Sequence, residues 1–286
     1  MTTVLERAYA GRKRAAMVAT VASVIAVAFA AVPLLAVTFY VLKRGLGALS
    51  IAFFTELPRS VGEPGGGMVN AIAGTLELVC LASLMGIPVG IAAGLFIAEY
   101  RATRLARAAR FCADVLAGVP SILVGVVVYA IVVVRMHRFS TFAGALSLAT
   151  LMLPLVARMT DELARTVPDS LREAALALGA PRWRIAIHVV LRTAAPGIRA
   201  GCMLAVARVA GESAPLLFTA FNNRFWNESL FEPTSSLEVQ IFTYTMSPYA
   251  DWHGQAWAAA LTLVALVIAL NLGARRVLRA KRGTFA

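Results

Sequence analysis

Charged side chains are scarce in this sequence. Asp, Glu, Lys and Arg make up only 15% of the 286 residues, whereas 59% are hydrophobic and the mean hydropathy is +0.76. Soluble domains contain about one quarter charged residues. The deficit excludes an ordinary soluble domain and indicates a chain that lies largely in lipid. The net charge of +12 is therefore interpreted as an orientation signal in a membrane protein, and no nucleic-acid partner is expected.

The side chains that build catalytic and metal sites are also few. The three cysteines and three histidines lie far apart, so neither a disulfide framework, a metal site nor a hydrolytic triad can be assembled from their spacing. The sequence also lacks the G-x-x-x-x-G-K-[ST] run of a P-loop. We therefore expect no catalytic residue, no metal and no cofactor, and energy for any active process must come from another subunit.

Long apolar runs, in contrast, are abundant. Crossing a bilayer as a helix takes about 20 apolar residues. Six stretches qualify, at about residues 17–42, 70–98, 115–134, 141–157, 198–221 and 256–274. The first stretch is too long for a signal-peptide core, so it is interpreted as a retained span. The fold class predicted is an all-α integral membrane protein with about six transmembrane helices, organised as an N-terminal segment 1–16, a single transmembrane domain 17–282 and a tail 283–286.

Lys and Arg residues are distributed unevenly between the loops. Twenty of the 27 fall before the first span, between spans two and three, between spans four and five, or after span six. Six fall in the opposite loops, and one lies inside span five. Because cytoplasmic loops carry an excess of basic residues, the asymmetry predicts a multi-pass protein with both termini in the cytoplasm.

The longest basic loop, residues 161–195, has the pattern of two helices joined by a turn. Ser170 to Glu173 fits an S-x-x-E capping box, and Gly179 stands where a left-handed helix cap is expected. Pro181 can open a second helix that starts at Arg182, and Pro196 is a candidate for its end. Such an amphipathic loop can lie on the lipid surface or insert into a groove of a partner protein.

A motif within this loop resembles a known coupling element. It consists of Glu173, Ala174, Ala175 and Gly179. The same residues at the same spacing form the EAA loop of ABC-transporter permeases, where the loop inserts into a cleft of a separate ATPase subunit. The resemblance implies that this motif, together with Arg182, couples the chain to an ATPase.

Two further runs narrow the resemblance to permeases of phosphate-uptake ABC transporters, the PstA type. Residues 118–125, GVPSILVG, are similar to the span-three signature of that family, and residues 208–217, RVAGESAPLL, are similar to its span-five motif. The similarity extends over about residues 65–250. It implies an inner-membrane permease with a homologous second permease, two copies of an ATPase subunit and an external phosphate-binding protein as partners.

Charged residues inside the predicted spans are candidates for the transport path, because such groups are costly in lipid and are retained with a partner or a function. Arg208 and Glu212 are four residues apart, which would place them on one helix face. They are interpreted either as a packing ion pair or as a lining that offers a guanidinium to phosphate. Glu77 and Thr75 in span two are further candidates for the path. A bond to a neighbouring helix explains Glu77 equally well, and threonines in membrane helices commonly bond to their own backbone.

Three alternative functions remain open from the sequence. A permease for another oxyanion, such as sulfate or molybdate, would belong to the same class. A membrane scaffold or passive channel would use the basic loop only to bind anionic lipid. An intramembrane enzyme is disfavoured, because no acid, base and nucleophile fall together at one depth.

Overall fold

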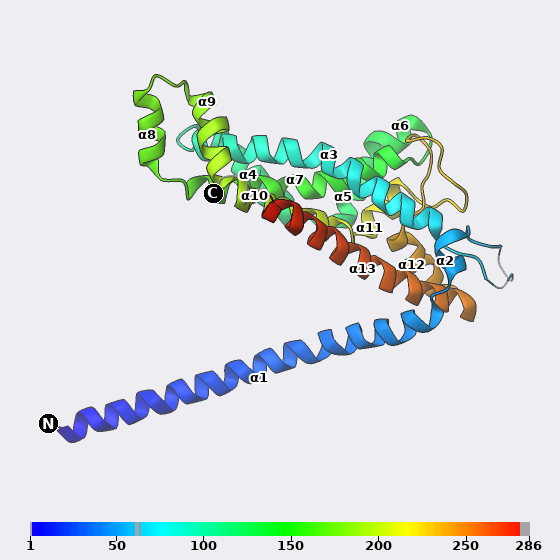
Figure 1. The fold of residues 1–286 in the computed structure, drawn as a ribbon, viewed down its shortest axis with the longest axis horizontal. Helices are drawn as coiled ribbons and strands as arrows, with labels where there is room; N and C mark the ends of the chain where they lie inside the picture. Colours follow the sequence, from blue (N-terminus) through cyan, green and yellow to red (C-terminus); the bar gives the residue numbers. More distant parts are fainter. Residues whose placement is uncertain (1, 61–62, 64, 281–286) are drawn as a thin grey trace.

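The computed structural model describes residues 2–60, 63 and 65–280, and every element in this part of the chain is helical (Figure 1). The helices are α1 (Thr2–Ala48), α2 (Ile51–Thr55), α3 (Val69–Glu99), α4 (Arg104–Gly118), α5 (Ser121–Val128), α6 (Val134–Met136), α7 (Thr141–Arg165), α8 (Asp169–Ala177), α9 (Arg182–Ile185), α10 (Leu191–Val209), α11 (Ala214–Thr219), α12 (Leu237–Thr245) and α13 (Ala250–Ala280). Two π-helical turns, Tyr129–Val133 and Ala186–Val190, join α5 to α6 and α9 to α10. The predicted tail, 283–286, lies outside the described residues.

The number of membrane-spanning elements agrees with the sequence-based expectation. Among the described residues, five helical segments are long and apolar enough to cross a bilayer: Ala16–Ala48, Val69–Glu99, Thr141–Arg165, Arg182–Val209 and Ala250–Leu272. Helix α4 and the α5–α6 segment form a sixth span if the bent pair is one crossing. The all-α membrane fold with about six spans is thus confirmed.

Helices α3 and α7 pack closely along their length and form the centre of the molecule. Glycines on α3 allow this approach: a Cβ added to Gly90 would lie 2.8 Å from the Cβ of Val156 on α7. Gly94, one turn further along, faces the backbone of Ala157 in the same way. Small residues at such contacts let membrane helices approach until backbones touch, which is the main source of packing energy where lipid replaces water.

Helix α1 leaves this bundle as a long arm (Figure 1). It contacts α13 near its C-terminal end, where Tyr40 packs edge-on against Trp257 with ring centroids 5.2 Å apart. Gly45 fits closely against Trp257 and Leu261 of the same helix. The side chains of its apolar segment from Met17 to Phe39 are almost all exposed, so their burial depends on lipid or on another chain.

The basic loop predicted over residues 161–195 is shorter in the structure. Helix α7 continues to Arg165, because Asp161 and Arg165 near its end form ion pairs that allow a helix to extend beyond its apolar stretch. At the other end of the loop, the helix that starts at Arg182 runs into α10 without interruption, and it continues through Pro196. The connecting segment is therefore 166–181, and Pro196 is not the helix end that we expected.

Two of the predicted spans are broken. The stretch 115–134 contains a bend of 105° between α4 and α5, centred on Val119 and Pro120. A residue before proline is kept out of the helical region, and Val119 adopts an extended conformation accordingly (φ −71°, ψ 130°). The stretch 198–221 breaks after Val209, and α11 starts anew with Pro215 in its first turn.

A buried polar cluster holds α12 against the first turns of α3, at the end of the bundle opposite α8 (Figure 1). The Thr75 hydroxyl donates to Oε2 of Glu238 at 3.2 Å and accepts the Leu237 amide N–H at 2.9 Å. Helix α12 has nine residues and does not cross the membrane by itself. Burial raises the pKa of Glu238 to about 7, because an ionised carboxylate is poorly solvated there.

This cluster predicts a fold that becomes less stable as the pH rises from about 4.5 to 7. Between about pH 4.5 and 7, Glu238 holds a proton in the folded chain and loses it in the unfolded chain, so stability falls as pH rises through this window, by up to about 3 kcal/mol. Glu238→Gln should give a thermal midpoint that no longer falls over this range, measured on detergent-solubilised protein. Glu228→Gln, which alters an exposed carboxyl in the segment between α11 and α12, should keep the wild-type slope. An unchanged slope in Glu238→Gln would contradict the assignment.

Candidate functional site: the Arg208 cleft and the α8 segment

The two helix breaks meet at one cleft. It has a volume of about 300 Å³ and lies between the α4–α5 bend, α7 and the end of α10. The lining residues are Leu116, Ala117, Gly118, Val119, Pro120, Ser121, Leu151, Pro154, Leu155, Arg208, Val209 and Glu212. Next to it α5 and α11 touch closely, since a Cβ on Gly125 would lie 2.6 Å from Cα of Pro215. Breaks of this kind free backbone groups that are tolerated at membrane depth only inside protein or beside a polar cavity.

Arg208 and Glu212 both line this cleft but are arranged differently from the prediction. Arg208 is exposed in the last turn of α10, whereas Glu212 lies beyond the helix end, in the turn that leads to α11. Its amide donates to the Val209 carbonyl at 3.2 Å. The two residues are therefore not on one helix face, and no ion pair joins them within the described part of the chain. The prediction failed because it treated residues 198–221 as one continuous helix, whereas the helix ends at Val209 and Pro215 opens the next one.

The two candidates from span two lie elsewhere. Thr75 is fully buried and its hydroxyl is used by α12, as described above. Glu77 is half-buried and has Asn227 of the α11–α12 loop as a hydrogen-bond partner. Neither residue lines the Arg208 cleft. The structure thus brings Arg208 and Glu212 together and places Thr75 and Glu77 in the contact between α3 and the α11–α13 connection.

The α8 segment forms a short helix and a tight turn, as the sequence predicts, but its start differs. The N-cap is Pro168 and makes no side-chain cap bond, so the predicted capping box at Ser170 is wrong. Ser170 lies inside the first turn, because the helix begins at Asp169, whose carboxylate favours a helix N-terminus. At the other end Gly179 has φ +78°, the left-handed conformation that we expected. The Ala180 amide donates back to the Ala175 carbonyl at 3.1 Å and closes the turn.

The motif residues present an open surface on this segment. Glu173 and Ala174 are exposed, Ala175 is half-buried, and Arg182 at the start of the next helix is exposed. Large apolar side chains surround them: Leu178 is 89% exposed and Trp183 is 55% exposed. A surface that combines apolar and charged side chains on a capped helix has the composition of a docking site for another protein.

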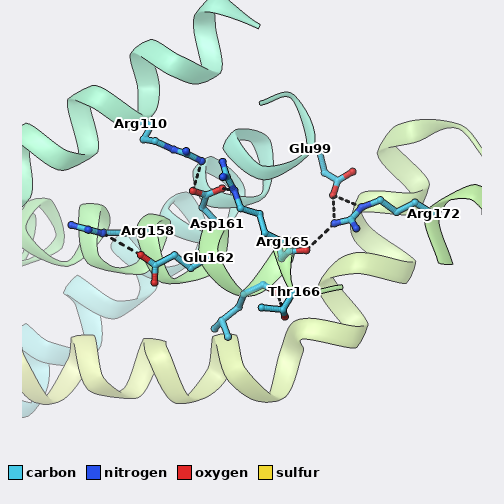
Figure 2. A network of polar contacts seen from close by, with 10 residues as sticks. Glu99, Arg110, Arg158, Asp161, Glu162, Arg165, Thr166 and Arg172 are labelled. Atoms are coloured by element: carbon cyan, nitrogen blue, oxygen red, sulfur yellow. Dashed lines mark hydrogen bonds and ion pairs between the residues drawn. The ribbon is translucent and has the colours of Figure 1, made fainter. Parts of the chain in front are cut away.

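Arg172 fixes α8 to the two central helices, and sequence reasoning missed it (Figure 2). Its guanidinium donates to Oε1 of Glu99, the last residue of α3, at 3.1 and 3.2 Å. It also donates to the carbonyls of Ala164 and Val167 at the end of α7, at 2.8 and 2.5 Å. Arg172 was counted only among the basic residues that orient the chain. The one feature of the sequence that hints at this contact is an acidic residue, Glu99, at the end of a span. A single sequence gives no reason to match Glu99 with Arg172 as an ion pair.

A second ion-pair cluster links α4 to α7 beside it (Figure 2). Asp161 accepts from Arg110 at 2.5 Å and from Arg165 at 2.8 Å. Because the Asp161 side chain is 9% exposed, these charge-assisted bonds are partly shielded from water. Both clusters lie at the α8 end of the bundle, where they hold the ends of α3, α4 and α7 in a fixed arrangement.

Comparison with known proteins identifies the family. The model of the family described as binding-protein-dependent transport system inner membrane component matches residues 86–283. The chain belongs to this family. As a member it is a membrane transport subunit.

Relatives and solved structures agree with this assignment. The phosphate transport system permease protein PstA of Yersinia pestis is 43% identical over 274 residues, 96% of this chain and 93% of that protein. The PstA of Haemophilus influenzae is 41% identical over 86% of this chain and 87% of that protein. Among solved structures, the MetNI methionine ABC transporter aligns with a TM-score of 0.62 at 20% identity, over 74% of this chain and 96% of that chain. A bacterial alginate ABC transporter in complex with its alginate-bound periplasmic protein aligns with a TM-score of 0.63 at 16% identity, over 85% of this chain and 87% of that chain. These structures show the shared fold.

Proposed function

We propose that this chain is the permease subunit of an ATP-driven importer of inorganic phosphate. The observation that carries the proposal is the 43% identity to a PstA permease over nearly the whole of both chains. Two features of the structure support it. A cleft lined by an arginine lies between the two broken helices, and an exposed coupling motif lies at one end of the bundle.

The proposed role of Arg208 is to bind the anion as it passes. A guanidinium offers paired donors that match a phosphate, and it stays charged at membrane depth. Glu212 lines the same cleft, and among the described residues it forms no ion pair with Arg208 in this conformation. In another conformation of the transport cycle Glu212 would pair with Arg208 and neutralise it, and it would release the guanidinium to the substrate in the conformation that binds the anion. Thr75 and Glu77 act in this proposal at the outer part of the path, where they connect α3 to the loops.

The proposed role of the α8 segment is to transmit ATPase motion. Glu173, Ala174, Ala175, Gly179 and Arg182 would seat the segment in a cleft of a cytoplasmic ATPase, with Leu178 and Trp183 as apolar anchors. Arg172 would pass a displacement of α8 to α3 and α7 through its bonds to Glu99, Ala164 and Val167. Alternating access would follow from movement of these helices around the Arg208 cleft.

The complete transporter in this proposal contains a homologous second permease, two ATPase subunits and an external phosphate-binding protein. The apolar exposed arm α1 is compatible with burial against lipid or against the second permease. The assembly tests the proposal directly. Reconstituted in liposomes, it should hydrolyse ATP faster when the phosphate-loaded binding protein is present outside. Stimulation by sulfate or molybdate in place of phosphate would favour a permease for another oxyanion, and failure to co-purify with any ATPase would favour a scaffold or passive channel.

The proposed topology places both termini and α8 in the cytoplasm, and it makes a separate prediction. In a background in which Cys80, Cys112 and Cys202 are replaced, single cysteines at the exposed positions Ser60 and Glu228 should react with a membrane-impermeant maleimide in intact cells. Cysteines at Arg104 and Ala177 should react only after the membrane is permeabilised. Labelling of Ala177→Cys in intact cells would reverse the orientation and exclude a cytoplasmic partner for α8.

A further inference from the structure

A second hollow, separate from the Arg208 cleft, opens where α3 ends and α4 begins. Its volume is about 460 Å³. Four arginines reach it from three elements: Arg101 from the α3–α4 turn, Arg107 and Arg110 from α4, and Arg165 from the end of α7. We propose that this arginine hollow binds the phosphate headgroup of an anionic phospholipid. The inference does not depend on which substrate the transporter carries.

The charges in the hollow leave a positive excess. Arg110 and Arg165 share the carboxylate of Asp161, which faces them at 2.5 and 2.8 Å. Asp114 at the rim lies 3.7 Å from Arg158. In the part of the chain that the structure describes, no ion pair involves Arg101 or Arg107. Two guanidinium groups therefore remain to donate to a phosphate, and Arg110 and Arg165 are held in place behind them.

The walls of the hollow favour a lipid over a free anion. Ile97, Ala102, Ala106 and Phe111 form most of its remaining lining, and the Phe111 side chain is 69% exposed. Leu105 on the same helix is 68% exposed. Inorganic phosphate would leave the exposed side chains of Phe111 and Leu105 in water, whereas the glycerol and acyl chains of a phospholipid would cover them.

The position of the hollow agrees with this ligand. It lies at the last residues of two apolar spans, α3 and α7, next to the ion-pair clusters at the α8 end (Figure 2). Headgroups lie at this level of a bilayer, and basic pockets between transmembrane helices bind anionic headgroups there. The arginines supply the charge and α4 supplies the apolar face that follows the acyl chain.

The test uses the full chain purified from nanodiscs that contain equal amounts of phosphatidylglycerol and phosphatidylethanolamine, with native mass spectrometry of the lipid that remains bound. Wild type should retain phosphatidylglycerol selectively, and Arg101→Gln with Arg107→Gln should lower this retention about tenfold. The control pair Arg104→Gln with Arg192→Gln removes the same charge from exposed positions outside the hollow and should retain lipid like wild type. Arg107→Lys keeps the charge and should lose little retention, which separates lipid binding from misfolding.

Two results would overturn the proposal. Equal retention in wild type, the Arg101 and Arg107 double variant and the control pair would show that the hollow holds no specific lipid. Displacement of phosphatidylglycerol by excess inorganic phosphate from wild type would show that the hollow is a site for the free anion instead.

Discussion

Arg208→Gln is expected to abolish phosphate uptake. Loss of a charge-assisted, two-donor contact to the anion removes roughly 3 kcal/mol, about a hundredfold in rate, even if the complex assembles normally. Arg208→Lys keeps the charge but loses the planar pair of donors, so it should retain partial activity. Uptake of radiolabelled phosphate by reconstituted vesicles measures both. Arg199→Gln is the matched control, because Arg199 lies on the same helix outside the cleft and donates only to its own helix backbone.

A loss of uptake in Arg208→Gln alone does not show whether transport or folding is impaired. It leaves the Glu212 carboxylate in the cleft without a nearby positive charge, and an uncompensated charge at membrane depth is costly. Arg208→Gln combined with Glu212→Gln removes both charges and should assemble like wild type, as judged by co-purification with its partners. We expect this well-assembled double variant to remain inactive. Recovery of phosphate uptake in it would show that the two residues serve packing only.

Gly179→Val is expected to uncouple the transporter with little effect on insertion. At φ +78° a β-branched side chain clashes with its own backbone, which costs about 1–2 kcal/mol or more and forces the turn into another conformation. Apart from Gly179 itself and its two chain neighbours, no atom of the described residues lies within 4 Å of a Cβ at this position, so the effect arises from the local backbone alone. The α8 helix would then be misplaced relative to its partner. Phosphate uptake should fall at least about tenfold while the protein reaches the membrane in normal amounts.

Two control variants test whether the loss of uptake in Gly179→Val comes from the left-handed backbone conformation. Gly179→Asn should retain most of the uptake, because asparagine tolerates the left-handed region far better than valine. Gly47→Val, at an exposed helical position in α1 with open space around it, should behave like wild type. If Gly179→Val transports phosphate at the wild-type rate and still co-purifies with the ATPase, α8 is not the coupling element.

Local rules predicted the α8 segment well because its conformation is determined by neighbouring residues. A glycine after an amphipathic helix specifies a left-handed cap from the sequence alone, and Gly179 adopts it. The helix start was missed for a similar local reason: Asp169 and Ser170 are both good first-turn residues, and only the backbone shows that Pro168 is the cap. Boundaries of one or two residues are rarely determined by pattern.

The Arg208 cleft could be predicted only in part. Hydropathy finds apolar stretches by their average and cannot detect that a stretch contains a break in the helix, as it does after Gly118 and after Val209. The distance between Arg208 and Glu212 depends on such a break, so the predicted helix-face pair was wrong while the two residues still line one cleft. Contacts between distant residues were also not predictable. Arg172 and Glu99 are 73 positions apart, and only the packing of α3 against α7 brings them together.

The close packing of α3 against α7 has a mechanical consequence. Because α3 and α7 are in close contact at Gly90 and Gly94, neither helix can shift along the other without steric clashes. The two helices therefore behave as one rigid body. At one end of this pair, Arg172 of α8 donates hydrogen bonds to Glu99 of α3 and to the Ala164 carbonyl in α7. At the other end, Thr75 of α3 is hydrogen-bonded to α12. In the proposed coupling mechanism, a displacement of α8 would therefore move α3 and α7 together over their whole length. The helix breaks after Gly118 and Val209 lie beside the Arg208 cleft, so in the proposed transport cycle they are the positions at which the helices would bend.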